Sequence, residues 1–227
     1  MNARVRSRVE MGRRALQFSR AHADESAGYT AAVSRLEERL VRAETLANQQ
    51  LNGIRATRAA STQRRIIRKA MMRGHLRHLA RVARLAAVEI PGIAERISLP
   101  PRNSTYLEFR TTAVSIATEA AAHLEVLVRY GLVESVVTEL NAALERFQVV
   151  TDAAMEARRA HVGASAELAN VATEIVAVVR VLDGLNTIRF TSDAESLAAW
   201  RSASNILDFV RGSVVPPEEG GEVQPAA

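Results

Sequence analysis

Apolar side chains recur at steps of three and four along most of the chain, which is the spacing of one face of an α-helix. The clearest run begins near residue 31 and lies close to the pattern of a coiled-coil seam. Arginine and glutamate fill the other faces of this predicted helix. The apolar positions of this run are Val33, Leu36, Leu40, Ala43, Ala47, Leu51 and Ile54.

A polar segment, 55–65, interrupts this periodicity, which resumes at 66–88. The segment contains no large apolar side chain, and it contains no proline or glycine either. It is therefore either a helix that is polar on all sides or a turn near Ser61 and Thr62. The pattern leaves open whether 26–90 is one helix or two. Pro91 and Gly92 end it.

The second half of the chain predicts three more helices. One runs from about Ser104 to Tyr130 and is capped by Gly131. The next is one long helix that starts near Val133, continues across Gly163 and ends at Asp183-Gly184. The last begins at a capping box formed by Ser192 and Glu195 and carries apolar residues as far as Val210. The first of these three has a predicted inner stripe of Leu107, Val114, Ala117, Ala121, Leu124 and Val128.

The ends and the central connector differ in composition from these helices. Residues 1–22 contain a basic helix over 3–21, and we expect a helical bundle domain over 23–211. The connector, 91–103, contains Pro100-Pro101, which excludes a continuous helix, and its Ile93, Ile97 and Leu99 are expected to contact the core. Proline, glycine and glutamate dominate 212–227, which predicts a disordered tail.

These elements predict an all-α protein, an elongated antiparallel helical bundle of about four long helices with N- and C-terminal helices added. Composition agrees, because only 4% of the residues are aromatic, whereas β-sandwiches rely on aromatic and β-branched pairs. A single lysine among thirty basic residues indicates a GC-rich, bacterial genome. There is no long apolar run and no signal peptide, so we expect a soluble, cytoplasmic protein. An arginine-rich start also resembles an organelle transit peptide.

Residues that carry catalytic or metal chemistry are few. Without cysteine, the chain has no thiolate ligand and no disulfide. His75 and His78 lie three apart among arginines that would repel a cation, and Glu119 and His123 form an i,i+4 pair typical of a solvated helix face. No nucleophile elbow, P-loop or dinucleotide fingerprint occurs. The sequence therefore predicts no catalytic, metal or cofactor site.

The charge distribution is the strongest signal in the sequence. Residues 1–88 carry 19 basic and 6 acidic side chains, whereas 89–227 carry 11 and 19. A stretch from Arg55 to Arg84 contains ten cations and no acid, and helical spacing aligns many of them. Its candidate partner-binding residues are Arg55, Arg58, Arg65, Arg68, Lys69, Arg73, Arg77, Arg81 and Arg84, with Arg64 as the tenth cation.

The partner of this basic stretch has several interpretations. Phosphates of a nucleic acid, anionic lipid headgroups and an acidic helix of this chain or of another all match its charge. The stretch has no aromatic residue, which disfavours single-stranded nucleic acid. The first hypothesis is a non-enzymatic structural or interaction protein that self-associates or docks a helical partner. Binding of nucleic acid or another polyanion is the alternative.

Overall fold

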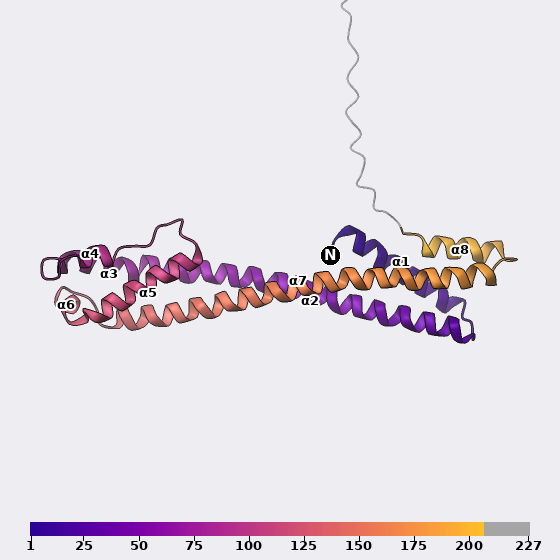
Figure 1. Ribbon diagram of the computed structural model, residues 1–227, viewed down its shortest axis with the longest axis horizontal. Helices are drawn as coiled ribbons and strands as arrows, with labels where there is room; N and C mark the ends of the chain where they lie inside the picture. The colour runs from indigo at the N-terminus through magenta and orange to yellow at the C-terminus, as the bar shows by residue number, and fades with distance from the viewer. Residues whose placement is uncertain (207–227) are drawn as a thin grey trace, which may run out of the picture. The chain divides into compact units, whose positions relative to one another are not determined.

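The computed structural model describes residues 1–206, and every regular element of this part is an α-helix (Figure 1). The prediction of an all-α fold is confirmed. No helix in this part is both long enough and apolar enough to cross a membrane. The helices are α1 (Ala3–Ala21), α2 (Ala27–Arg73), α3 (His75–Ala86), α4 (Ile93–Arg96), α5 (Tyr106–Ala122), α6 (Leu124–Arg129), α7 (Ser135–Arg189) and α8 (Ala194–Ser204).

Contacts divide the described residues into two compact units. Residues 1–48 and the residues from 164 onward form unit 1, and residues 49–163 form unit 2. The long helices α2 and α7 each contribute one segment to each unit. No proline or glycine marks residues 48 and 49, so the sequence pattern did not locate this boundary.

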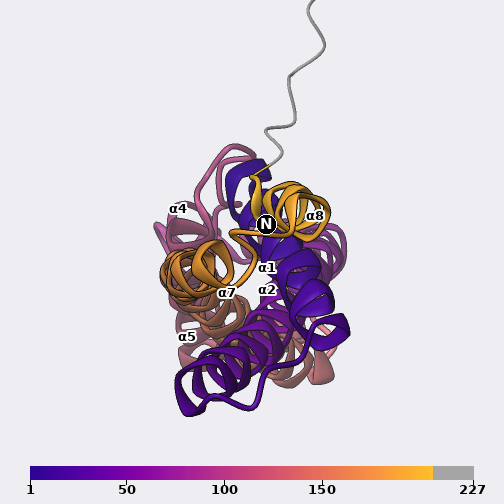
Figure 2. The ribbon, with the colours of Figure 1, turned by 90° about the vertical axis from the view of Figure 1, so that its right-hand side faces the viewer.

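Unit 1 is a helical bundle built from α1, α8 and the unit 1 segments of α2 and α7, which Figure 2 shows nearly end-on. Most of the seam predicted on α2 lies in its core, where Leu36, Leu40 and Ala43 are buried, but the prediction was wrong for Leu51, which is 44% exposed. These residues pack in one cluster with Ile175 of α7. The apolar face of α2 is therefore covered by helices of the same chain.

An aromatic cluster closes one region of the unit 1 core. Trp200 of α8 is fully buried, and its ring centroid lies 5.4 Å from that of Phe18 on α1. Its indole Nε1–H donates a hydrogen bond of 2.7 Å to Asp183 of α7. Phe190 meets Phe18 edge-on at 5.9 Å. These contacts fix α1 and α8 to the end of α7, because buried aromatic rings supply large apolar areas.

Unit 2 has a separate core, in which α3 contacts α4, α5 and α6. Phe109 of α5 is fully buried and packs 5.6 Å from Phe147 of α7, measured between ring centroids. Ile93 and Ile97 of the connector are buried in this core as predicted. The same prediction was wrong for Leu99, which is 37% exposed.

The polar segment 55–65 is helical and belongs to α2, so the alternative of a turn at Ser61 and Thr62 was wrong. The hydroxyl groups of Thr57 and Ser61 donate to the carbonyls of Gly53 and Thr57, each at 2.8 Å. Side-chain hydroxyls are thus satisfied within the helix and do not compete with it. The break comes later, at Gly74, and makes two helices of 26–90.

The helix predicted over 104–130 is divided at His123 into α5 and α6. Its predicted stripe was also largely wrong, because Leu107 is 72% exposed whereas Phe109 is buried. The face with the phenylalanine packs inward, where the ring meets Phe147. The prediction for the end of this region is confirmed: Gly131 adopts a φ of 95°, and Leu132 N–H donates to the carbonyl of Leu127 at 2.9 Å, a Schellman cap.

Helix α7 is continuous across Gly163, as predicted, but it ends at Arg189 and not at Asp183-Gly184. The N-cap of α8 is Asp193, whose carboxylate accepts from the Ser196 N–H at 3.0 Å, so the predicted capping box of Ser192 and Glu195 was wrong. Helix α8 ends at Ser204. The predicted tail, 212–227, lies outside the described residues.

Candidate functional site

All ten cations from Arg55 to Arg84 lie in unit 2, on α2 and α3. Two of them, Arg64 and Arg68, are half-buried, and the others are exposed. We call the exposed group the basic surface. Its members are Arg55, Arg58, Arg65, Lys69, Arg73, Arg77, Arg81 and Arg84.

Helical spacing aligns the cations of the basic surface. On α2, Arg58, Arg65 and Lys69 are seven and four residues apart, which places them on one face. On α3, Arg77, Arg81 and Arg84 are four and three apart. The opposite face of α3 is buried, because Leu76, Leu79 and Val82 pack into the core of unit 2. Burial of the apolar face of α3 thus leaves its arginines on the exposed face.

Within residues 1–206, none of these ten cations forms an ion pair with a carboxylate. Acids of unit 2 pair with other bases. Arg129 pairs with Glu89, and Arg96 Nε lies 3.0 Å from Glu119. In the described part of the chain, the excess carboxylates after residue 88 therefore do not neutralise the basic surface.

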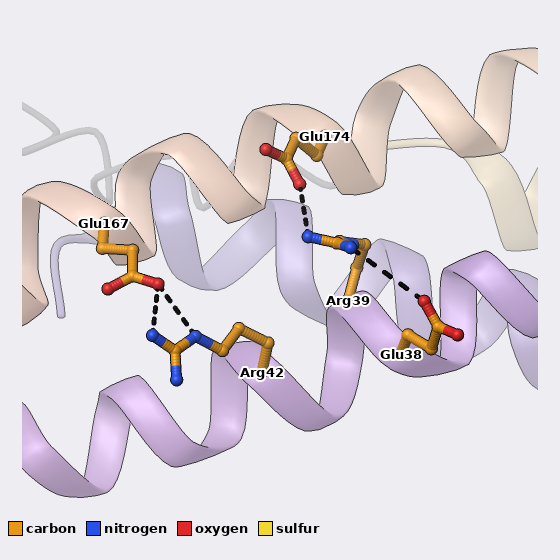
Figure 3. Close-up of polar contacts among 5 residues, drawn as sticks. All are labelled: Glu38, Arg39, Arg42, Glu167 and Glu174. Carbon is orange, nitrogen blue, oxygen red and sulfur yellow. Dashed lines mark hydrogen bonds and ion pairs between the residues drawn. The ribbon is translucent and has the colours of Figure 1, made fainter.

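In unit 1, two arginines of α2 form ion pairs with glutamates of α7, as Figure 3 shows. Arg39 donates to Glu174 of α7 at 3.1 Å. One turn further along α2, Arg42 Nε donates to Glu167 at 2.8 Å. Glu38 also lies within 4.0 Å of Arg39. One helix thus carries charges that are matched across the bundle in unit 1 and charges that are left to solvent in unit 2.

The two half-buried arginines have structural partners. Arg68 donates to the backbone carbonyls of Ser104 at 2.8 Å and Arg102 at 3.1 Å, and to the Ser104 hydroxyl at 3.0 Å. Its guanidinium carbon lies 4.8 Å from the centre of the Phe109 ring. That of Arg64 lies 4.1 Å from the centre of the Tyr106 ring. Sequence reasoning treated Arg68 as one more outward cation, whereas it also fastens the connector before α5 to α2.

A groove of about 480 Å³ lies between α2, α3 and this connector. Sequence reasoning missed one of its cations, Arg102, because it follows Pro100-Pro101 in a segment without periodicity and is brought near α2 only by the tertiary fold. No carboxylate is among the described residues that line the groove. These residues are Arg65, Arg68, Lys69, Met72, Arg73, Arg77 and Arg102.

Two histidines each make one contact with an acidic side chain. His75 Nε2 lies 3.2 Å from Glu139, and His123 lies 3.7 Å from Glu119 one turn earlier on the chain. The second contact confirms the predicted i,i+4 pair. Among the described residues, no three His, Asp or Glu side chains gather as a metal site would require.

Within residues 1–206, three carboxyl groups have a lowered pKa, and all of them lie at helix N-termini. Hydrogen bonds from Ser26 lower the pKa of Asp24, those from Thr105 lower the pKa of Glu108, and those from Ser196 lower the pKa of Asp193. Thr105 and Glu108 form a reciprocal capping box at the start of α5. Capping accounts for these shifts, because a carboxylate that accepts backbone N–H groups is stabilised in its charged form.

Comparisons with protein-family models, with curated proteins and with solved structures find no match for this chain.

Proposed function

We propose that the protein binds a nucleic-acid duplex through the basic surface of unit 2. One observation supports the proposal above all others: the ten cations from Arg55 to Arg84 have no carboxylate partner within residues 1–206. Like charges that are close together repel each other, so their accumulation on one surface is best explained by an anionic partner. Phosphates along a duplex provide that partner at regular intervals.

The length of the basic surface fits the phosphate backbone of a nucleic acid better than it fits an isolated anion. From Arg55 to Arg73 the helix rises about 27 Å, at ~1.5 Å per residue. A duplex presents one phosphate charge for about every 1.7 Å of its axis, so several cations can contact phosphates at once. We expect little base specificity, since backbone contacts carry no sequence information directly.

Two features favour a duplex over the other anionic partners. A membrane-surface helix inserts an apolar face between headgroups, but Leu76, Leu79 and Val82 of α3 are buried in the protein core, which leaves Leu85 as the one exposed large apolar side chain of this helix. Single strands are bound by aromatic stacking, and 55–84 contains no aromatic residue. The nearby Tyr106 ring is covered by the Arg64 guanidinium.

Fluorescence anisotropy with a labelled duplex of arbitrary sequence tests the proposal across a range of salt concentrations. We expect log-linear loss of affinity with salt, and the triple variant Arg77→Ala, Arg81→Ala, Arg84→Ala should reduce the slope by about 2 to 3. The control variant removes the same charge from exposed arginines of unit 1: Arg35→Ala, Arg180→Ala, Arg201→Ala. Absence of binding at low salt, or equal losses in the two variants, would contradict the proposal.

Association with a second copy of the chain is the other candidate function. An open groove of about 670 Å³ runs between α5 and α7, with Val114, Leu144 and Val149 among its lining residues. Arg110 and Glu145 also line it, so a two-fold related copy would bring unlike charges together. Light scattering tests this candidate: a dimer that dissociates on Val149→Glu supports it, whereas a monomer of 24.7 kDa at all concentrations excludes it.

A further inference from the structure

The groove beside Arg102 differs from the rest of the basic surface in shape. Four of the eight basic-surface residues lie outside the groove, on exposed faces of α2 and α3, whereas the other four line the groove, which is bounded by α2, α3 and the connector. Six of the seven described residues that line it are cations, and the seventh is Met72. A concave site concentrates positive potential more strongly than a convex helix face carrying the same charges.

The cations of the groove are partly preorganised. Two guanidinium nitrogens of Arg68 already donate three hydrogen bonds to the connector, at Ser104 and at the Arg102 carbonyl. These bonds, together with the contact of Arg68 with the Phe109 ring, hold the backbone of Arg102 beside α2. A ligand therefore meets cations from two segments whose backbones are fixed before binding, which lowers the entropy lost on association.

We propose that this groove is a binding site for a compact oligophosphate, a chain of linked phosphates such as inorganic tripolyphosphate or the triphosphate of a nucleotide. Arginine forks match phosphate oxygens two at a time, and lysine contributes a point charge, so a short chain of phosphates satisfies this set of donors. A single phosphate would leave most of the five cations other than Arg68 without a partner. The site goes beyond duplex binding, although it shares Arg65, Lys69, Arg73 and Arg77 with the basic surface.

The lining also predicts what the site does not recognise. A nucleotide base is selected by aromatic stacking and by polar groups placed at its edge. Met72 is the one apolar residue among those described as lining the groove, and no aromatic residue lines it. Recognition is therefore expected to depend on the phosphate chain, with similar affinities for ATP, GTP and inorganic tripolyphosphate.

Isothermal titration of the full chain with tripolyphosphate at low salt tests the proposal. We expect saturable binding at one site, with ATP and GTP of similar affinity and citrate much weaker. Arg102→Ala, which removes an exposed side chain, should weaken tripolyphosphate binding by about tenfold, the effect of one charge-assisted contact. Arg84→Ala removes the same charge outside the groove and should change the affinity by much less.

A second variant separates positioning from charge. Arg68→Lys retains the cation but loses the fork that holds the connector, so tripolyphosphate affinity should fall although the net charge is unchanged. Circular dichroism confirms that the variant is folded. Equal losses for Arg102→Ala and Arg84→Ala, citrate binding as strong as tripolyphosphate, or no saturation would each overturn the proposal.

The two functional proposals fail separately in these experiments. Tripolyphosphate binding without any affinity for a duplex would refute the proposed function and leave the groove site standing. Duplex binding with no saturable tripolyphosphate site would refute the groove site alone. A marked preference for ATP over inorganic tripolyphosphate would show that the base is recognised and would overturn the assignment to the phosphate chain.

Discussion

Unit 1 and unit 2 differ in what their arginines contact. In unit 1, Arg39 and Arg42 of α2 pair with Glu174 and Glu167 of α7 (Figure 3). In unit 2, the cations from Arg55 to Arg84 have no carboxylate partner among the described residues. On α2, Arg39 and Arg42 thus pair within the fold, whereas the exposed cations of unit 2 are available to a partner. Exposed arginines of unit 1 such as Arg35 also lack a carboxylate partner among the described residues, so arginine content alone does not predict binding.

The largest expected effect is on stability, and it tests whether each unit has a core of its own. Trp200→Ala removes a fully buried ring from unit 1 and should destabilise that unit by about 3 to 5 kcal/mol. Hydrogen exchange should then speed up in α1 and α8, while amides around Phe109 in unit 2 keep their protection. Phe109→Ala should produce the reverse pattern. Equal loss of protection in both units after either change would show that the two cores unfold together.

A close helix contact in unit 1 gives the next largest effect. A Cβ added at Gly12 of α1 would lie 2.5 Å from Ile175 Cγ2 and 3.3 Å from Leu40 Cδ2. Isoleucine is stiff at χ1, so the contact cannot be relieved cheaply, and Gly12→Ala should cost about 1 to 3 kcal/mol. Gly28→Ala is the control, because a Cβ there meets nothing within 4 Å. If both variants melt at the parental temperature in a thermal scan, the contact of Gly12 with Ile175 and Leu40 does not limit the size of the side chain there.

The difference in charge pairing predicts a smaller effect on stability. Arg42→Ala breaks an exposed ion pair and should lower the free energy of unfolding by about 0.2 to 1 kcal/mol. Arg77→Ala should leave that free energy unchanged or raise it, because it relieves repulsion on the basic surface. Urea denaturation at low and at high salt measures both, and the difference should shrink when salt screens the charges. A larger loss for Arg77→Ala would mean that the basic surface has a structural partner.

The smallest effect is a pH dependence at the start of α5. The pKa of Glu108 is lowered in the folded chain by its hydrogen bonds with Thr105, so the carboxylate form is favoured by folding. Its contribution is complete above the pKa of the unfolded chain and is lost as the pH falls through the lowered, folded pKa. Glu108→Gln should therefore show a shallower loss of stability in acid than the parent. Identical acid unfolding curves for the two proteins would remove Glu108 from this account.

Hydrophobic periodicity was sufficient to predict the fold class and most helices. It predicted the seam at Leu36 and Leu40 and the continuity of α7 across Gly163. It failed on α5, where Leu107 and Phe109 lie on different faces and both faces carry apolar residues at helical spacing. Tertiary contacts such as that with Phe147 decide which face is buried, and these contacts join residues far apart in the sequence.

Part of the candidate site was predictable from the sequence, and the part that depends on tertiary contacts was not. A run of cations without acids is visible in the sequence, and helical spacing places most of them on shared faces. Arg102 was not predictable, because its place in the groove depends on the connector that Arg68 fastens to α2. The absence of intramolecular partners for the basic surface was equally hidden, since it depends on where every carboxylate of the described chain lies.

The central claim, that the unpartnered cations of unit 2 bind phosphates, is tested most directly by locating the contact. Photo-crosslinking of the full chain to a duplex, followed by peptide mass spectrometry, identifies the residues that touch the nucleic acid. The account predicts crosslinks within 55–84 and at the connector around Arg102. Crosslinks concentrated in unit 1, for example on the arginines of α1, would contradict it.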